Sequence, residues 1–107
     1  DSLALALYAR IKEIDPGYPA PYYNTGYILL EHEKRVADAR REFNLAIERM
    51  PDYAQAYYSR GVTYELENKL DSALEDYKLA IGLSPQHTEA ALGLSRLEKR
   101  GLKVKVR

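Results

Sequence analysis

Apolar residues recur along this chain at intervals of three and four positions, the spacing of one face of an α-helix. Six segments show this pattern, and each ends near a proline, a glycine or a polar turn: residues 2–14, 20–33, 37–49, 54–67, 71–83 and 87–100. Asp71 or Ser72 is expected to cap the fifth helix and Thr88 the sixth, because their side-chain oxygens can accept hydrogen bonds from free backbone N–H groups. Gly101 is expected to end the last helix. The pattern therefore predicts an all-α fold of antiparallel helix pairs joined by short turns.

The helical segments repeat in pairs. Residues 21–26 match residues 56–61, which lie 35 positions later, and residues 39–47 match residues 73–81, which lie 34 positions later. One extra residue therefore lies in the first copy, between its two helices. We expect the second helix of a partial repeat at 1–18, full repeats at 19–53 and 54–87, a closing helix at 88–101 and a basic tail at 102–107. Because the chain starts within a unit, the sequence suggests a fragment of a longer protein.

The residues that repeat are aromatic, glycine, alanine and proline. In the second copy they are Tyr57, Gly61, Tyr64, Ala73, Tyr77, Ala80 and Pro85, and in the first Tyr22, Gly26, Leu29, Ala39, Phe43, Ala46 and Pro51. This order resembles the tetratricopeptide repeat (TPR), which has a period of about 34 residues. The chain departs from the family at Thr25 and Arg60, where the family usually has leucine. The resemblance implies a single TPR domain over 1–107, built as a right-handed solenoid of about six helices.

Small residues are expected where helices approach each other closely. Gly26 and Gly61 are expected to face Ala39 and Ala73 of the same repeat. A repeat cannot bury its apolar face alone, so stacked neighbours make the core. The two ends of the stack are therefore expected to expose apolar side chains: Leu3, Leu7 and Ile11 on the first helix, and Leu94 and Leu97 on the last.

The resemblance also implies a concave face, lined by the first helix of each repeat, that binds a peptide. The second, fifth, sixth and ninth positions of a helix share one face. The candidate partner-binding residues chosen from these positions are Tyr23, Asn24, Tyr27, Gln55, Tyr58, Ser59, Val62, Leu92 and Arg96. Tyrosine suits peptide recognition because it combines apolar area with a hydroxyl group. For Tyr23 and Tyr58, packing between repeats is an equally good interpretation.

Some TPR proteins hold the C-terminal carboxylate of a chaperone with Lys, Asn and Arg side chains from three first helices. In this chain Tyr23 and Tyr27 stand at the first Lys and Asn positions of that clamp. Gln55 and Glu89 stand at its later Lys positions. The resemblance therefore does not extend to the clamp, and we do not expect this chain to bind such a tail.

Composition and charge narrow the class of protein. The 107 residues include 16 basic and 16 acidic side chains, a formal net charge of zero, and no cysteine. Balanced charge argues against a nucleic-acid partner, and no apolar run reaches the roughly 18–20 residues of a membrane span. The last twelve residues carry six basic side chains, which are interpreted as a solvated helix end and a frayed tail. Contact with an acidic partner, a membrane surface or RNA is the alternative. Cytoplasm and bacterial envelope both fit, so the sequence leaves the compartment open.

Candidate catalytic chemistry is sparse. His32 and Glu33 begin like a zinc-protease helix, but Val36 stands where the second histidine must be. His32 is interpreted as a solvated turn residue and His87 as the start of a helix cap. We therefore predict a scaffold that binds a peptide or protein partner, with no enzymatic activity, metal or cofactor. The alternatives are a structural segment of a longer solenoid, a self-associating module without its own peptide groove, and a docking domain within a larger enzyme or secretion machine.

Overall fold

The computed structural model describes residues 2–104, which form six α-helices and no strand. The helices are α1 (Ser2–Ile14), α2 (Ala20–Glu31), α3 (Val36–Arg49), α4 (Ala54–Leu66), α5 (Leu70–Leu83) and α6 (Thr88–Lys99). The predicted all-α fold is confirmed, and each predicted helix boundary lies within two residues of the observed one. The helices belong to two compact units, unit 1 (Asp1–Asp52) and unit 2 (Tyr53–Arg107), which are described separately below.

Two of the predicted helix caps are wrong. Helix α5 begins one residue early, with Lys69 at its N-cap position and no side-chain cap, so Asp71 and Ser72 lie inside the first turn. From the first turn of α5, the Asp71 carboxylate still interacts favourably with the positive end of the helix dipole. Helix α6 is capped by His87, as the sequence suggested for that histidine, and Thr88 is instead its first helical residue.

The extra residue of the first repeat lies in the turn between α2 and α3, as predicted. In the shorter α4–α5 turn, the Lys69 N–H donates to the Tyr64 carbonyl at 2.9 Å. In the longer turn, the equivalent bond runs from the Arg35 N–H to the Leu29 carbonyl, also at 2.9 Å. Each turn holds one residue with positive φ, Lys34 at 57° and Asn68 at 61°. The insertion therefore lengthens the turn without changing the bond that closes it.

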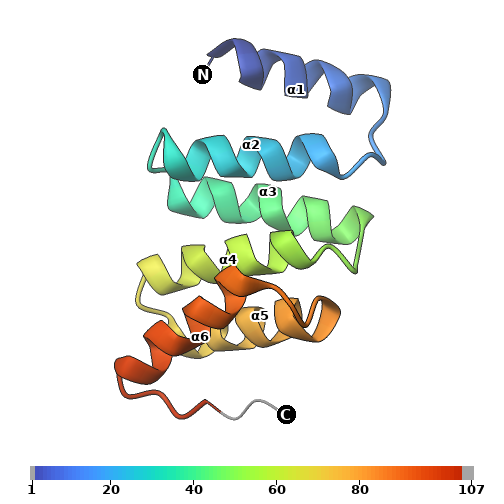
Figure 1. The fold of residues 1–107 in the computed structure, drawn as a ribbon. Helices are drawn as coiled ribbons and strands as arrows, with labels where there is room; N and C mark the ends of the chain where they lie inside the picture. The colour runs from blue at the N-terminus through green and yellow to red at the C-terminus, as the bar shows by residue number, and fades with distance from the viewer. Residues whose placement is uncertain (1, 105–107) are drawn as a thin grey trace. The chain divides into compact units, whose positions relative to one another are not determined.

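Unit 1 consists of α1, α2 and α3, each antiparallel to the next (Figure 1). Its core contains the fully buried ring of Phe43, which lies against Gly26 of α2. A Cβ atom at position 26 would lie 2.6 Å from that ring and 3.1 Å from the carbonyl oxygen of Ala39. Only glycine therefore allows α2 and α3 to approach this closely, and the predicted contact between Gly26 and Ala39 is confirmed.

Charged and aromatic side chains help to hold α1 and the turn after it against the rest of unit 1. Lys12 forms an ion pair with Glu42 of α3 at 2.7 Å, and its Nζ lies 4.8 Å from the ring centroid of Tyr22. The guanidinium of Arg49 lies 4.0 Å from the same centroid and donates to the Pro16 carbonyl at 2.6 Å. Cation–π contacts and hydrogen bonds thus supplement the packing of α1, which contains no buried residue.

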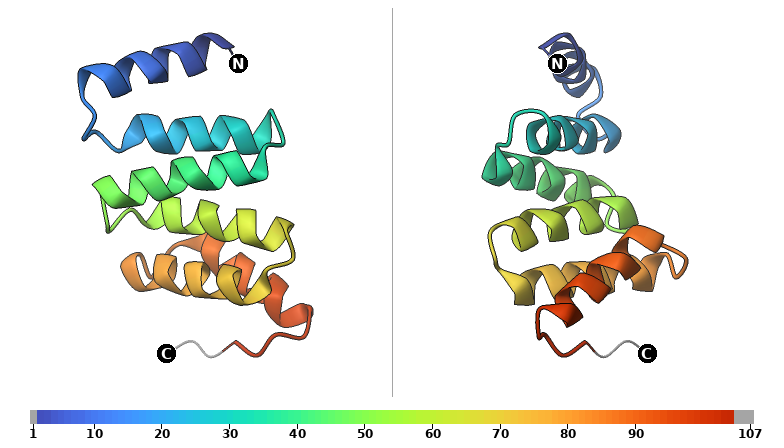
Figure 2. Two further views of the ribbon diagram at one scale, coloured as in Figure 1. Left: turned by 180° about the vertical axis from the view of Figure 1, so that it is seen from behind. Right: turned by 60° about the vertical axis from the view of Figure 1, so that its left-hand side comes forward.

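Unit 2 is built around the ring of Tyr77, which is fully buried. Helices α4 and α5 are antiparallel, and α6 crosses α5 obliquely (Figure 2). Cβ atoms built at Gly61 of α4 and at Gly93 of α6 would each lie 2.7 Å from opposite edges of the Tyr77 ring. The third nearest atom to a Cβ at position 61 is Cβ of Asp76 at 3.2 Å, so Gly61 lies against α5, the helix that carries the predicted partner Ala73. The glycine makes room for the aromatic ring of Tyr77.

The C-terminal end of unit 2 is better covered than the sequence predicted. Leu94 and Leu97 are buried with Tyr77, so the prediction that they are uncovered is wrong. Leu102 and Val104 pack against the same cluster, so the described part of the tail is not frayed. The tail residues 105–107 lie outside the described residues. The predicted apolar face of α1 is confirmed, since its members are exposed: Leu3, Leu7 and Ile11.

Replacing Gly61 with leucine is expected to lower the free energy of unfolding by about 1–3 kcal/mol, because the new side chain would overpack against the Tyr77 ring. The matched control is Gly82→Leu, since a Cβ atom at that position meets nothing within 4 Å. Urea unfolding followed by circular dichroism measures both. Equal stability of the two variants would contradict this packing arrangement.

Candidate partner-binding surface of unit 2

One face of unit 2 combines exposed apolar side chains with two arginines. We call it the α4–α6 surface, and it consists of Tyr58, Val62 and Leu66 of α4 and Leu92, Arg96 and Arg100 at or just after α6. In each set the residues are four apart, so they share one side of the helix. Leu66 is 62% exposed and Leu92 56% exposed. Because these exposed leucines share a face with charged groups, the surface is a candidate for contact with a partner.

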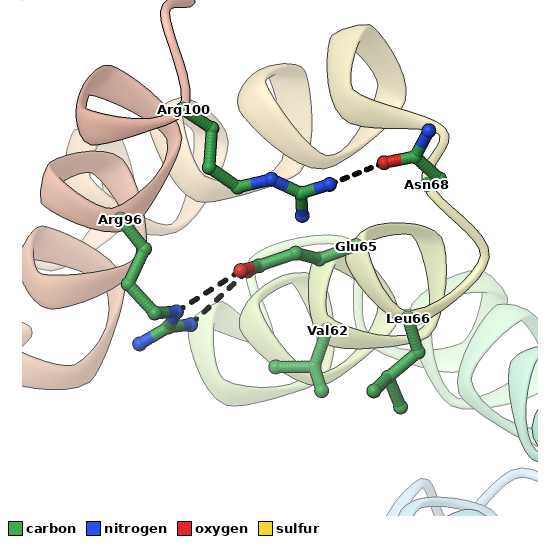
Figure 3. Close-up of a pocket in the computed structure, with 6 residues that line it drawn as sticks. All are labelled: Val62, Glu65, Leu66, Asn68, Arg96 and Arg100. Carbon is green, nitrogen blue, oxygen red and sulfur yellow. Dashed lines mark hydrogen bonds and ion pairs between the residues drawn. The ribbon is translucent and has the colours of Figure 1, made fainter.

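A pocket of about 390 Å³ opens on this surface (Figure 3). Its lining comes from α4, from α6 and from the residues that follow each helix: Val62, Glu65, Leu66, Asn68, Arg96 and Arg100. In Figure 3 Arg96 extends from α6 toward Glu65, and Arg100, just after α6, extends toward Asn68 in the turn after α4. Val62 and Leu66 lie below Glu65 in the same view. The pocket thus has a polar side and an apolar side.

Glu65 is the centre of the polar side. Its carboxylate accepts two hydrogen bonds from Arg96, both of 3.1 Å, and one from the Tyr77 hydroxyl at 2.6 Å. Burial raises the pKa of Glu65, but the hydrogen bonds from Arg96 and Tyr77 outweigh this and lower the pKa overall. Burial and the neighbouring Glu65 raise the pKa of Tyr77. At neutral pH the carboxylate is therefore charged, the phenol is protonated, and Arg96 is held in place.

Arg100 approaches Glu65 from the side opposite to Arg96 (Figure 3). Its Nη2 donates to Oδ1 of Asn68, which is a neutral amide oxygen. Within residues 2–104, no carboxylate forms an ion pair with Arg100, although its charge contributes to lowering the pKa of Glu65. The pocket lining carries two guanidinium groups and one carboxylate, which leaves one uncompensated positive charge.

At the other end of the surface, side chains join α4 to the start of α6. Nδ1 of His87 accepts a hydrogen bond from the Ala90 N–H at 3.1 Å, so the ring proton is on Nε2. Nε2 then donates to Oε1 of Gln55 at 2.8 Å, and Nε2 of Gln55 donates to Glu89 at 3.3 Å. Gln55, one of the predicted partner-binding residues, is thus used to position α6.

The other predicted residues of unit 2 differ in accessibility. Val62, Leu92 and Arg96 lie on the α4–α6 surface. The half-buried Tyr58 ring lies 5.7 Å from the ring of Tyr77 and 5.3 Å from that of His87, centroid to centroid. Ser59 is only 5% exposed, so we leave it out of the candidate surface.

In unit 1, the three predicted residues lie on α2. The ring of Tyr23 lies 5.5 Å from that of Phe43, as Tyr58 does from Tyr77 in unit 2. This shared arrangement agrees with the packing interpretation of Tyr23 and Tyr58. Asn24 is half-buried, and Tyr27 is 48% exposed, which makes it the most accessible of the three.

The sequence-based selection missed part of the pocket, namely Glu65, Leu66, Asn68 and Arg100. Two of them follow from the same helical spacing, because Leu66 comes four residues after Val62 and Arg100 four residues after Arg96. Arg100 is instead interpreted from the sequence as part of a solvated helix end. No comparable signal points to the bond between Glu65 and Tyr77, which lie on different helices.

Among the helices of residues 2–104, none is both long enough and apolar enough to cross a membrane. Within the same residues, no group of three or more His, Cys, Asp or Glu side chains is arranged to hold a metal ion.

Relatives of this chain are found among curated proteins. The chain is 30% identical over 89 residues to a UDP-N-acetylglucosamine–peptide N-acetylglucosaminyltransferase of Giardia intestinalis, which covers 83% of this chain and 6% of the transferase. It is 34% identical over 62 residues to protein PHOX1 of Arabidopsis thaliana, which covers 58% of this chain and 8% of PHOX1. The chain thus spans less than a tenth of either relative.

Solved structures and a family model indicate the protein family of this chain. The first TPR of Spaghetti (RPAP3) bound to the HSP90 peptide SRMEEVD has a TM-score of 0.84 and 27% identity, covering 90% of this chain and 75% of that one. The Arabidopsis OM64 TPR domain has a TM-score of 0.85 and 23% identity, covering 90% and 78%, and supports the fold alone. A family model described as tetratricopeptide repeat matches residues 54–87. The helix pairs repeat, and the glycine and aromatic positions of the two repeats follow the order of the tetratricopeptide repeat. This chain belongs to the tetratricopeptide repeat family.

Proposed function

We propose that this chain is a protein–protein interaction module that binds a peptide segment of its partner on the α4–α6 surface. The observation that carries the proposal is the pocket of about 390 Å³, with exposed leucine on one side and fixed arginine on the other. Helices α4 and α6 are the first helices of their repeats, and the resemblance to the family places peptide binding on such helices, which supports the proposal. Tyr27 of α2 is the most exposed counterpart of this surface in unit 1.

The comparisons support a peptide partner but not one particular peptide. The similar RPAP3 domain binds a peptide of HSP90. In this chain the clamp positions hold other residues, and two of these, Gln55 and Glu89, bond to each other at 3.3 Å. We therefore do not extend that partner to this chain. The glycosyl transfer of the Giardia relative also lies outside the proposal, because the chain spans 6% of that protein.

A selection of random peptides displayed on phage tests the proposal without assuming a partner. Peptides enriched on this chain are synthesised, and their dissociation constants are measured by titration calorimetry. The joint change Leu66→Ala and Leu92→Ala is expected to weaken binding about tenfold or more, because both leucines bury apolar area under the peptide.

The matched control changes two exposed leucines of α5, Leu79→Ala and Leu83→Ala, whose exposures are 42% and 44%. This control is expected to leave the dissociation constant unchanged. Failure to enrich any peptide, or an equal loss of affinity in both double variants, would contradict the proposal.

Self-association is a second candidate function, favoured by the apolar face of α1. Leu3 and Leu7 are 69% and 55% exposed on the same side of that helix. Exposed leucines four residues apart can pack against a second copy of the chain. Sedimentation velocity over a range of concentrations tests this: an increase in mass that Leu7→Glu abolishes supports it, and a monomer at all concentrations contradicts it.

A further inference from the structure

We infer that the pocket between α4 and α6 takes an acidic side chain, aspartate or glutamate, of the bound peptide, with an apolar residue next to it. This inference rests on the proposed function, since it names the class of peptide that the α4–α6 surface binds. Arg100 contacts the carboxylate, Arg96 is the positioning residue beside it, and Val62 and Leu66 contact the apolar neighbour.

Arg100 can accept the acidic side chain because its present partner is neutral. Its Nη2 donates to the amide oxygen of Asn68, and within residues 2–104 no carboxylate forms an ion pair with it. The Arg100 guanidinium is charged in both cases, but a carboxylate adds an opposite charge and can accept two parallel hydrogen bonds from it, whereas the amide oxygen adds no charge. A peptide carboxylate therefore replaces the amide oxygen with a gain in bond strength.

Arg96 cannot fill the same role, because its charge is already compensated. Nε and Nη2 of Arg96 both donate to Glu65, and that carboxylate is fixed in turn by the buried Tyr77 hydroxyl. The network keeps the polar side of the pocket in one geometry before a peptide arrives. A preorganised site loses less conformational entropy when it binds.

The charge balance of the pocket favours a carboxylate over a phosphate group. Two arginines and one glutamate line the pocket, so one unit of positive charge is left to be neutralised. A carboxylate brings a single negative charge. A phosphorylated side chain brings about −1.5 to −2 at pH 7 and would place the excess next to Glu65.

The size and walls of the pocket fit an acidic residue with an apolar neighbour. The volume of about 390 Å³ is near the lower end of ligand pockets, which range over about 300–1,000 Å³. Val62 and Leu66 lie beside each other next to Glu65 (Figure 3). An apolar peptide side chain packed there shields the ion pair at Arg100 from water, which strengthens it.

The test uses the synthetic peptides obtained by phage selection on the whole chain. We expect the enriched sequences to share an Asp or Glu beside an apolar residue, and Asp→Asn or Glu→Gln in the peptide to weaken binding about tenfold. Arg100→Gln is expected to weaken binding of the acidic peptide by the same factor. On the peptide in which Asn or Gln replaces the acidic residue, Arg100→Gln is expected to cause no further loss of affinity. The change in the protein and the change in the peptide remove the same contact, so their effects do not add.

The matched control is Lys99→Gln, which removes an exposed positive charge one residue away that does not line the pocket. It is expected to change the dissociation constant less than twofold, and Arg100→Lys is expected to restore part of the affinity. Thermal melts establish that each variant is folded.

The outcomes separate this inference from the proposed function. Enriched peptides without an acidic residue, equal effects of Arg100→Gln and Lys99→Gln, or tighter binding of a phosphoserine peptide would overturn the acidic-residue pocket. Peptide binding that still depends on Leu66 and Leu92 would then preserve the proposed function. Failure to enrich any peptide would contradict both.

Discussion

Replacing Tyr77 with alanine is expected to lower the free energy of unfolding by about 3–5 kcal/mol, the range for removing a large aromatic side chain from a core. The ring is fully buried and fills the space between Gly61 and Gly93, which have no side chains to occupy the cavity. Its hydroxyl also donates to Glu65 at 2.6 Å, so the change removes a partner from that carboxylate.

Urea unfolding followed by far-ultraviolet circular dichroism measures the effect. The control is Tyr77→Phe, which keeps the ring and removes only the hydroxyl. It is expected to cost about 1–2 kcal/mol, because Glu65 keeps its two hydrogen bonds from Arg96. A loss below about 1 kcal/mol for the alanine variant would contradict the central position of Tyr77.

The second large effect concerns the ion pair between Arg60 of α4 and Asp76 of α5. The guanidinium donates to both carboxylate oxygens, at 2.9 Å and 2.7 Å, and Asp76 is only 2% exposed. Arg60→Met is expected to cost about 3–5 kcal/mol, because it removes the cation that compensates a buried carboxylate. The arginine also stands where the family usually has leucine, so an apolar residue fits the fold at that position.

The control is the double change Arg60→Met with Asp76→Leu. Replacing a buried ion pair by apolar residues of similar volume is often neutral or stabilising, so the double variant is expected to recover most of the loss. A double variant less stable than Arg60→Met alone would show that Asp76 contributes through other contacts. Thermal unfolding of both variants under the same conditions gives the comparison.

The sequence predicts the six helices and the repeat because both depend on local spacing. Helical periodicity and the positions of proline and glycine lie within a single segment, so neighbouring residues carry the information. The side chain that packs against Gly61 could not be predicted in the same way. The repeat pattern shows that position 61 needs a small residue, but not which side chain fills the space beside it. Only the packing of three helices places Tyr77 there.

The candidate surface was predicted only in part, because some of its residues follow from local spacing and others from contacts between helices. Val62, Leu92 and Arg96 follow from the helical face, whereas the pocket also needs Glu65 and Asn68, which bond to residues of α6 or just after it. Leu94 and Leu97 are buried in one cluster with Ala73 and Tyr77 of α5, which lie about twenty positions earlier in the chain. Contacts across such distances in sequence leave no periodic signal.

The most direct test of the proposed function maps where a peptide binds. Backbone amide chemical shifts of ¹⁵N-labelled chain are recorded while an enriched synthetic peptide is added. The proposal predicts that the largest changes fall on the α4–α6 surface, at Val62, Leu66, Leu92, Arg96 and Arg100. Changes confined to the exposed leucines of α5, or to α1, would contradict it.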